Sequence, residues 1–127
     1  MELKLFKTLW GFDGDYGRAA AQAKTAGFDG LEGQVPEEPA AREALQAALD
    51  AHGLGFIAEI TTAGSYVPDR RAGVEAHLAS LEAGLARSAA LDPLKVTAIA
   101  GCDAWPEDDS RRFFAAAMAL GERQGLA

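Results

Sequence analysis

Four apolar stretches alternate with four helical segments along this chain, and this alternation constrains the fold more than any other sequence feature. Glycine marks the boundaries. In KTAGFDGLEG and DAHGLGFIAEI, a helical stretch ends at Gly27 or Gly53 and an apolar stretch follows at once. The apolar stretches predict strands, which we expect at residues 3–10, 28–35, 54–63 and 94–101.

The segments between and after these stretches predict helices. Asp13 or Asp15 is placed to cap the first, and Pro39 lies near the first turn of the second. We expect the third to start near Asp69, and Pro106 with the acidic residues after it to open the fourth. Apolar residues at helical spacing predict the buried sides of the last three helices: Leu45, Leu49, Val74, Leu78, Leu81, Leu85, Phe113, Phe114, Ala117 and Leu120.

Strict alternation of strand and helix predicts an α/β fold with a parallel sheet covered by helices. Two architectures fit. One is a small doubly wound sheet, and the other is half of a (β/α)₈ barrel, which needs about 250 residues in full. The glycine rule also predicts a strand after Gly125, where only Leu126 and Ala127 follow. We therefore expect residues 1–127 to form a single domain that is half a barrel, truncated before strand five.

Composition excludes several classes of partner. The net charge is −7 without any basic patch, which argues against nucleic acid. Apolar runs are broken well short of the ~18 residues of a membrane span. MELKLFKTLW lacks the features of a signal peptide, and the lone Cys102 cannot form an internal disulfide. We expect a cytoplasmic protein that binds neither nucleic acid nor membrane.

Two glutamates lie in or just after apolar strands. Ligands bind at the carboxyl ends of the strands in either architecture, so Glu32 and Glu59 are candidates for a binding site there. A carboxylate in such a place costs several kcal/mol unless a partner stabilises it. The alternative is that each pairs with a neighbouring basic side chain or lies in water.

Further candidates lie in the loops after the strands. Asp103 has the chemistry to contact a sugar hydroxyl, and Trp105 to stack on a sugar face. Equally, Asp103 could cap the turn before Pro106 while Trp105 covers the rim of the sheet. Trp10 has the same ambiguity, and the long loop with Ser65 and Tyr66 after the third strand suggests substrate contact.

Other reactive side chains give weaker signals. His52 and His77 fall on helices, where a histidine is more often structural or solvated than a ligand. Cys102 has no histidine near it on a strand that would make it a nucleophile. The sequence contains neither G-x-x-x-x-G-K-[ST] nor G-x-G-x-x-G, which counts against nucleotide-binding versions of the fold.

The segments LFKTLWG, AKTAGFDGLEG, FIAEITTAGSYVP and AGCDAW together resemble the N-terminal half of the sugar phosphate isomerase/epimerase family, the xylose isomerase-like TIM barrels. G-[FY]-D-G-[LIV]-E at residues 27–32 is the most specific piece. The resemblance covers essentially the whole chain. It implies a metal-dependent isomerase or epimerase that moves a proton next to the carbonyl of a small sugar or polyol.

The resemblance also implies a divalent metal, Mn²⁺ or similar, at the mouth of the intact barrel. In the sugar epimerases the metal ligands and both catalytic glutamates come mainly from strands five to eight. Only substrate-side residues therefore carry over to this chain: Trp10, Glu32, Glu59 and the GCDAW loop. Ile99 and Ala100 stand where several relatives carry a histidine, which argues against the endonuclease IV branch.

Two functions of different class follow. One is a fragment of an enzyme, weak or inactive alone, that binds a small sugar or polyol. The other is a non-catalytic half-barrel that assembles as a homodimer, because its two edge strands and its inner face are open. A complete flavodoxin-like module, monomeric and with a buried central strand, is a third alternative.

Overall fold

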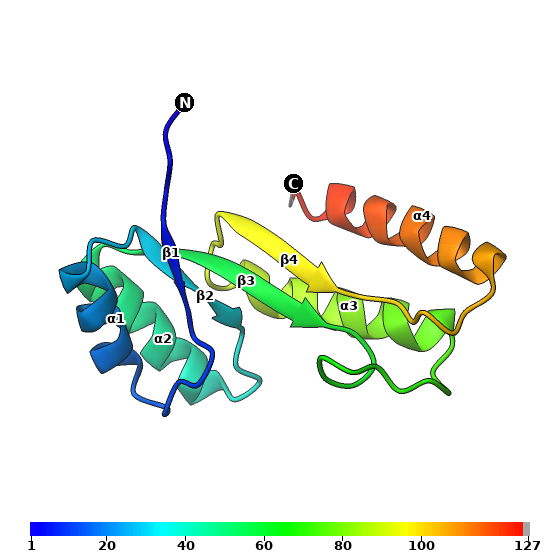
Figure 1. Cartoon of the computed structure of the whole chain (residues 1–127), viewed down its shortest axis with the longest axis horizontal. Coiled ribbons are helices and arrows are strands. Elements are labelled where there is room, and N and C mark those ends of the chain that lie inside the picture. Colours follow the sequence, from blue (N-terminus) through cyan, green and yellow to red (C-terminus); the bar gives the residue numbers. More distant parts are fainter. Residues whose placement is uncertain (126–127) are drawn as a thin grey trace.

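A computed structural model describes residues 1–125, in which strands and helices alternate from one end to the other (Figure 1). The strands are β1 (Phe6–Thr8), β2 (Gly30–Gln34), β3 (Gly55–Thr61) and β4 (Lys95–Ile99). The helices are α1 (Tyr16–Thr25), α2 (Pro39–His52), α3 (Val74–Ala89) and α4 (Glu107–Arg123). The strands form one parallel sheet in the order β1-β2-β3-β4, which confirms the predicted α/β class and its four strand–helix units.

The helix boundaries follow the predicted signals closely. Asp15 is the N-cap of α1, and its Oδ1 accepts a hydrogen bond from the backbone N–H of Arg18 at 2.9 Å. Pro39 is the first residue of α2. Gly27, Gly53 and Gly125 adopt left-handed φ angles of 82°, 58° and 64° directly after helices, where a side chain would be strained. The strand predicted after Gly125 lies outside the described residues.

Two predicted boundaries are wrong. Strand β1 does not extend over residues 3–10, because β2 begins only at Gly30 and leaves the residues before Leu5 without a neighbouring strand. Helix α3 does not begin near Asp69. The Asp69 carboxylate accepts a hydrogen bond from the backbone N–H of Arg71 at 2.9 Å, and this turn delays the helix until Val74.

The helices pack against one face of the sheet. Side chains alternate along each strand, so Leu31, Phe56, Ala58 and Ile60 all point to the same side. One core cluster joins Leu31, Phe56 and Ala58 to α1 and α2, and a second joins Ile60 to α3 and α4. Both clusters lie on this side, and Val96 of β4 packs against each of them.

The opposite face of the sheet, called the open face below, has no helix over it in residues 1–125. Every side chain on it is half-buried or exposed. It consists of Phe6, Thr8, Glu32, Gln34, Ile57, Glu59, Thr61, Lys95, Thr97 and Ile99. The open face is therefore where this sheet can meet a ligand or another protein.

The strand order argues against the doubly wound alternative. A doubly wound sheet reverses its strand order and carries helices on both faces. Residues 1–125 show neither feature, because the strands follow one another in chain order and the helices share one face.

Phe114 corrects one prediction about the core. Phe113 and Leu120 of α4 are buried as predicted, but Phe114 is 54% exposed. Neighbouring residues on a helix point about 100° apart, and α4 contacts the rest of residues 1–125 mainly along the side that carries Phe113. Among residues 1–125, nothing therefore covers the outer side of α4.

Candidate functional site

Tyr66 lies at the centre of a group of polar and aromatic side chains at the carboxyl ends of the first three strands. The side chains of Glu59, Gln34 and Trp10 lie close enough to its hydroxyl group to shift the pKa of the phenol. The rings of Tyr66 and Trp10 are tilted by 52°, with centroids 5.0 Å apart. We call these four residues the Tyr66 cluster.

The local fold explains why these four side chains meet. Gln34 and Glu59 are register partners on neighbouring strands, so they lie side by side on the open face. Trp10 is the second residue after β1. The β3–α3 loop bends back on itself through a bridge between Gly64 and Pro68, which holds Tyr66 near the strand ends.

The electrostatics of the cluster fix the state of the phenol. The hydrogen bond with Glu59 raises the pKa of Tyr66 above its ordinary value of 10.0, and desolvation and the charge of Glu59 raise it further. Hydrogen bonds with Gln34 and Trp10 act in the opposite direction. Tyr66 therefore stays protonated at neutral pH and can donate a hydrogen bond.

Glu59 has an unsatisfied oxygen. Its Oε1 is buried without any hydrogen-bond partner in the described part of the chain. An unpaired buried polar atom costs about 1–3 kcal/mol, and a charged one costs more, so such an atom marks a place where a ligand would restore lost hydrogen bonds. Glu59 also borders a cavity of about 150 Å³ beside Arg87, whose Nε is likewise buried and unpartnered.

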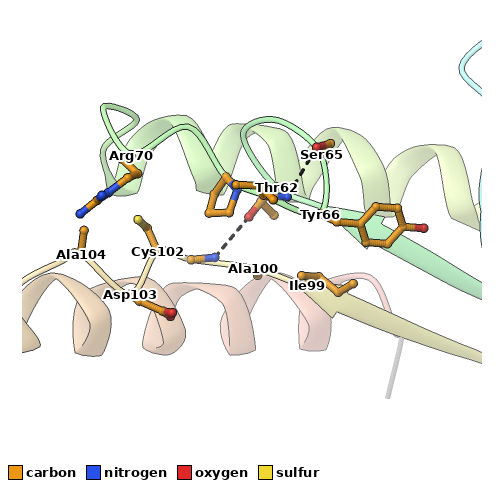
Figure 2. Close-up of a pocket in the computed structure, with 12 residues that line it drawn as sticks. Thr62, Ser65, Tyr66, Arg70, Ile99, Ala100, Cys102, Asp103 and Ala104 are labelled. Carbon is orange, nitrogen blue, oxygen red and sulfur yellow. Dashed lines mark hydrogen bonds between the residues drawn. The ribbon is translucent and has the colours of Figure 1, made fainter.

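Tyr66 stands between two larger cavities. The first, of about 510 Å³, lies between the loops that follow β3 and β4 and is shown in Figure 2. The predicted residues Ser65 and Asp103 line it together with Arg70 and Cys102. The Asp103 side chain points away from Arg70 (Figure 2), and Ser65 accepts a long hydrogen bond of 3.5 Å from the backbone N–H of Val67.

The second cavity, of about 530 Å³, lies on the other side of Tyr66. Trp10 and Gln34 line it together with Tyr16 and the backbone around Gly33. Three members of the Tyr66 cluster thus border this space, and the fourth, Glu59, lies beside Tyr66 and Gln34. The structure therefore brings together three of the predicted residues: Trp10, Glu59 and Tyr66.

Glu32 lies on the open face, nearer the amino ends of the strands than the Tyr66 cluster. It belongs to the register row Thr8–Glu32–Ile57–Lys95, one step nearer the amino ends of the strands than Glu59. It is half-buried, and no ion pair within residues 1–125 involves it. The structure therefore separates Glu32 from the Tyr66 cluster while keeping it on the same face.

Trp105 lies apart from the other candidates. Its ring packs against His77 and Phe113, with centroids 4.7 and 5.4 Å away, and its Nε1–H donates a hydrogen bond of 3.2 Å to the backbone oxygen of Ala72. This position fits the alternative in which Trp105 covers the rim of the sheet.

Sequence reasoning missed Thr62, which also lines the first cavity. Its hydroxyl oxygen lies 2.7 Å from Nδ1 of His77 and accepts a hydrogen bond from the backbone N–H of Gly101 at 3.3 Å (Figure 2 shows the second contact). The sequence did offer a way to find it: Phe56, Ala58 and Ile60 alternate along β3, and continuing this alternation places Thr62 on the helix side. His77 is fully buried and has a structural part in this contact.

The described residues do not by themselves present a metal centre. No group of three or more histidine, cysteine, aspartate or glutamate side chains lies close enough in residues 1–125 to hold an ion. The unpartnered Oε1 of Glu59 offers one ligand, whereas a protein metal site usually has three or more. These residues alone therefore do not fit the metal that the resemblance implies.

A comparison with family models, curated protein sequences and solved structures finds no match. None of the helices in residues 1–125 is long and apolar enough to cross a membrane.

Proposed function

We propose that this chain is the first half of a (β/α)₈ barrel of the sugar isomerase/epimerase type, and that the Tyr66 cluster binds a small sugar or polyol at its mouth. The strand order and the placement of all helices on one face support the half-barrel. In such a barrel the open face becomes the interior, and the carboxyl ends of the strands surround the substrate.

One observation carries the proposal: the half-buried Glu59 side chain has an unpartnered oxygen beside a protonated phenol and an exposed indole. A carboxylate accepts hydrogen bonds from sugar hydroxyl groups. The rings of Tyr66 and Trp10 offer apolar faces on which the C–H side of a sugar can pack. The cluster therefore combines the two kinds of contact that a polyol needs.

The cluster also suits proton transfer beside a carbonyl group. Glu59 can accept a proton from the carbon next to a substrate carbonyl, and Tyr66 can donate a hydrogen bond to an oxygen that becomes negative. A bound divalent metal would stabilise that negative charge in an intact barrel. Its ligands would have to come from outside the Tyr66 cluster, so the proposal for this chain concerns substrate binding.

Ligand binding tests the proposal. Calorimetry with aldoses, ketoses and linear polyols should detect binding to the wild-type chain, and Glu59→Gln should weaken it about tenfold or more, because a charged acceptor becomes a neutral one. Glu82→Gln makes the same chemical change on the exposed surface of α3 and should leave the affinity unchanged. Equal affinities for the wild type and Glu59→Gln, or no binding by the wild type, would rule the proposal out.

A further inference from the structure

Both edge strands of the sheet, β1 and β4, have a free side on which another parallel strand could pair. Within residues 1–125, β1 pairs only with β2 and β4 pairs only with β3, so each leaves one side of its backbone unpaired. All four strands are parallel. A two-fold axis along the strand direction would therefore bring β4 of one copy beside β1 of another with parallel orientation, and would do so at both edges at once.

We propose that a second copy of this chain covers the open face in this way and closes an eight-stranded barrel. The proposal rests on the half-barrel architecture of the proposed function, but it does not depend on sugar binding. Unpaired edge strands favour association, and a closed barrel removes both edges. The second copy is favoured as the partner because both edges of the sheet are open to the same parallel pairing, and because one register row carries a glutamate and a lysine that would alternate with those of the second copy.

The charges lie in one register row. Thr8, Glu32, Ile57 and Lys95 are successive partners across β1, β2, β3 and β4, so all four side chains are on the open face. Neither Glu32 nor Lys95 forms an ion pair within residues 1–125. Within this row each chain therefore presents one unpaired negative and one unpaired positive side chain, two strands apart, while Glu59 lies in the next row towards the carboxyl ends.

Two-fold closure completes an alternating ring. The strand order around the barrel would be β1, β2, β3, β4 and then the same four strands of the second copy. Glu32 on β2 and Lys95 on β4 would then alternate at every second strand, so each glutamate has a lysine two strands away on either side. Opposite charges attract each other more strongly in the barrel interior than in water, and this ring carries two of each sign.

Apolar surface beside the open edges supports the same arrangement. Phe114 and Met118 lie one turn apart on the outer side of α4 and are 54% and 69% exposed. Leu3 and Leu5, directly before β1, are 78% and 50% exposed. Figure 1 shows the segment before β1 and helix α4 at opposite ends of the strand order. A second copy at each edge would bring the two apolar surfaces together.

Closure would also change the site. Each copy contributes one Tyr66 cluster at the carboxyl ends of its strands, and all eight strands of the closed pair run in the same direction. Two Glu59 carboxylates would therefore face a single mouth, one from each copy. The binding site of a lone chain is incomplete on this account.

Charge-swap variants test the proposal when their masses are measured by light scattering over a dilution series without ligand. The wild type should scatter as a species of about twice 13.3 kDa. Lys95→Glu and Glu32→Lys should each raise the dimer dissociation constant at least tenfold, because every charge in the ring then has the same sign. The double variant should restore the wild-type constant.

Matched controls separate this effect from net charge. Arg71→Glu and Glu82→Lys change the charge by the same amounts at exposed positions in the third unit, away from both edges, and should leave the dissociation constant unchanged. Circular dichroism establishes that each variant is folded. A wild-type monomer, an open-ended polymer, or a dimer insensitive to both single swaps would each overturn the proposal. Sugar binding by a monomer would overturn the dimer and leave the proposed function standing.

Discussion

The Nδ1 atom of His77 and the hydroxyl oxygen of Thr62 lie 2.7 Å apart, and both side chains are buried at the carboxyl end of β3. The same oxygen accepts the backbone N–H of Gly101 at 3.3 Å. One hydroxyl group thus connects β3, α3 and the loop after β4, and it holds one wall of the first cavity in place.

Replacing this hydroxyl group should destabilise the fold. Thr62→Val keeps the shape of the side chain but leaves His77 and Gly101 without their partner, so we expect the free energy of unfolding to fall by about 2 kcal/mol. Urea unfolding measures it. Thr61→Val is the matched control, because Thr61 points to the open face, and it should cost less than about 0.5 kcal/mol. Equal losses from both variants would contradict this account.

Stability should decrease below about pH 6.5 through His77. Burial lowers the pKa of His77 below its ordinary value of 6.5, so the unfolded chain binds a proton at a pH where the folded chain resists it. The stabilising contribution is complete above about pH 6.5 and is lost as the pH falls towards the lower pKa of the folded state. It can amount to at most about 1.4 kcal/mol per pH unit.

Unfolding at pH 7.5 and at pH 5.5 measures this dependence. His77→Gln should remove the His77 part of the difference between the two values. The rings of Trp105 and Phe113 pack against His77 and do not titrate in this range. A wild-type difference that persists in folded His77→Gln would show that other groups cause it.

The Tyr66 phenol should titrate differently without the Glu59 carboxylate. Because the hydrogen bond and charge of Glu59 raise the pKa of Tyr66, Glu59→Gln should lower that pKa towards 10.0. The phenolate absorbance during alkaline titration measures it. Tyr16, whose pKa burial raises, is replaced by phenylalanine in both proteins so that only Tyr66 titrates. An unchanged Tyr66 titration would show that the two groups do not interact in solution.

Gly84 should be intolerant of a side chain. A Cβ at this position of α3 would lie 2.7 Å from Cγ2 of Ile60, closer than packed carbon atoms allow. We expect Gly84→Ala to destabilise the fold by about 1–3 kcal/mol, despite the better helix propensity of alanine. Gly17→Ala in α1 meets only Asp15 at 3.5 Å and should not lower stability. Thermal unfolding of both variants distinguishes them, and a stabilised Gly84→Ala would contradict the packing described.

The backbone architecture was largely readable from the sequence because local signals determine it. The glycines after the helices, the Asp15 cap and Pro39 all act within a few residues, and each has the predicted effect. The start of β1 depends on where the neighbouring strand begins, and the start of α3 depends on one turn, so their predicted boundaries were wrong.

The site was only partly predictable for a related reason. The rule that ligands bind at strand ends selected Trp10, Glu59 and Tyr66, which the structure places close together, and their role in binding stays a prediction. The same rule could not show that Trp105 lies away from these residues. Trp105 packs between α3 and α4, and its position depends on the path of the loop after β4. Thr62 carries no chemical signal until its partner His77 is known.

The two indole groups of the chain give the most direct test of the proposed binding site. Trp10 belongs to the Tyr66 cluster, whereas the Trp105 Nε1–H is held by the backbone of Ala72. In a ¹⁵N-correlated spectrum, titration with the tightest-binding polyol or ketose should shift the Trp10 indole resonance and leave that of Trp105 in place. Movement of Trp105 alone, or of neither resonance, would contradict a sugar site at the Tyr66 cluster.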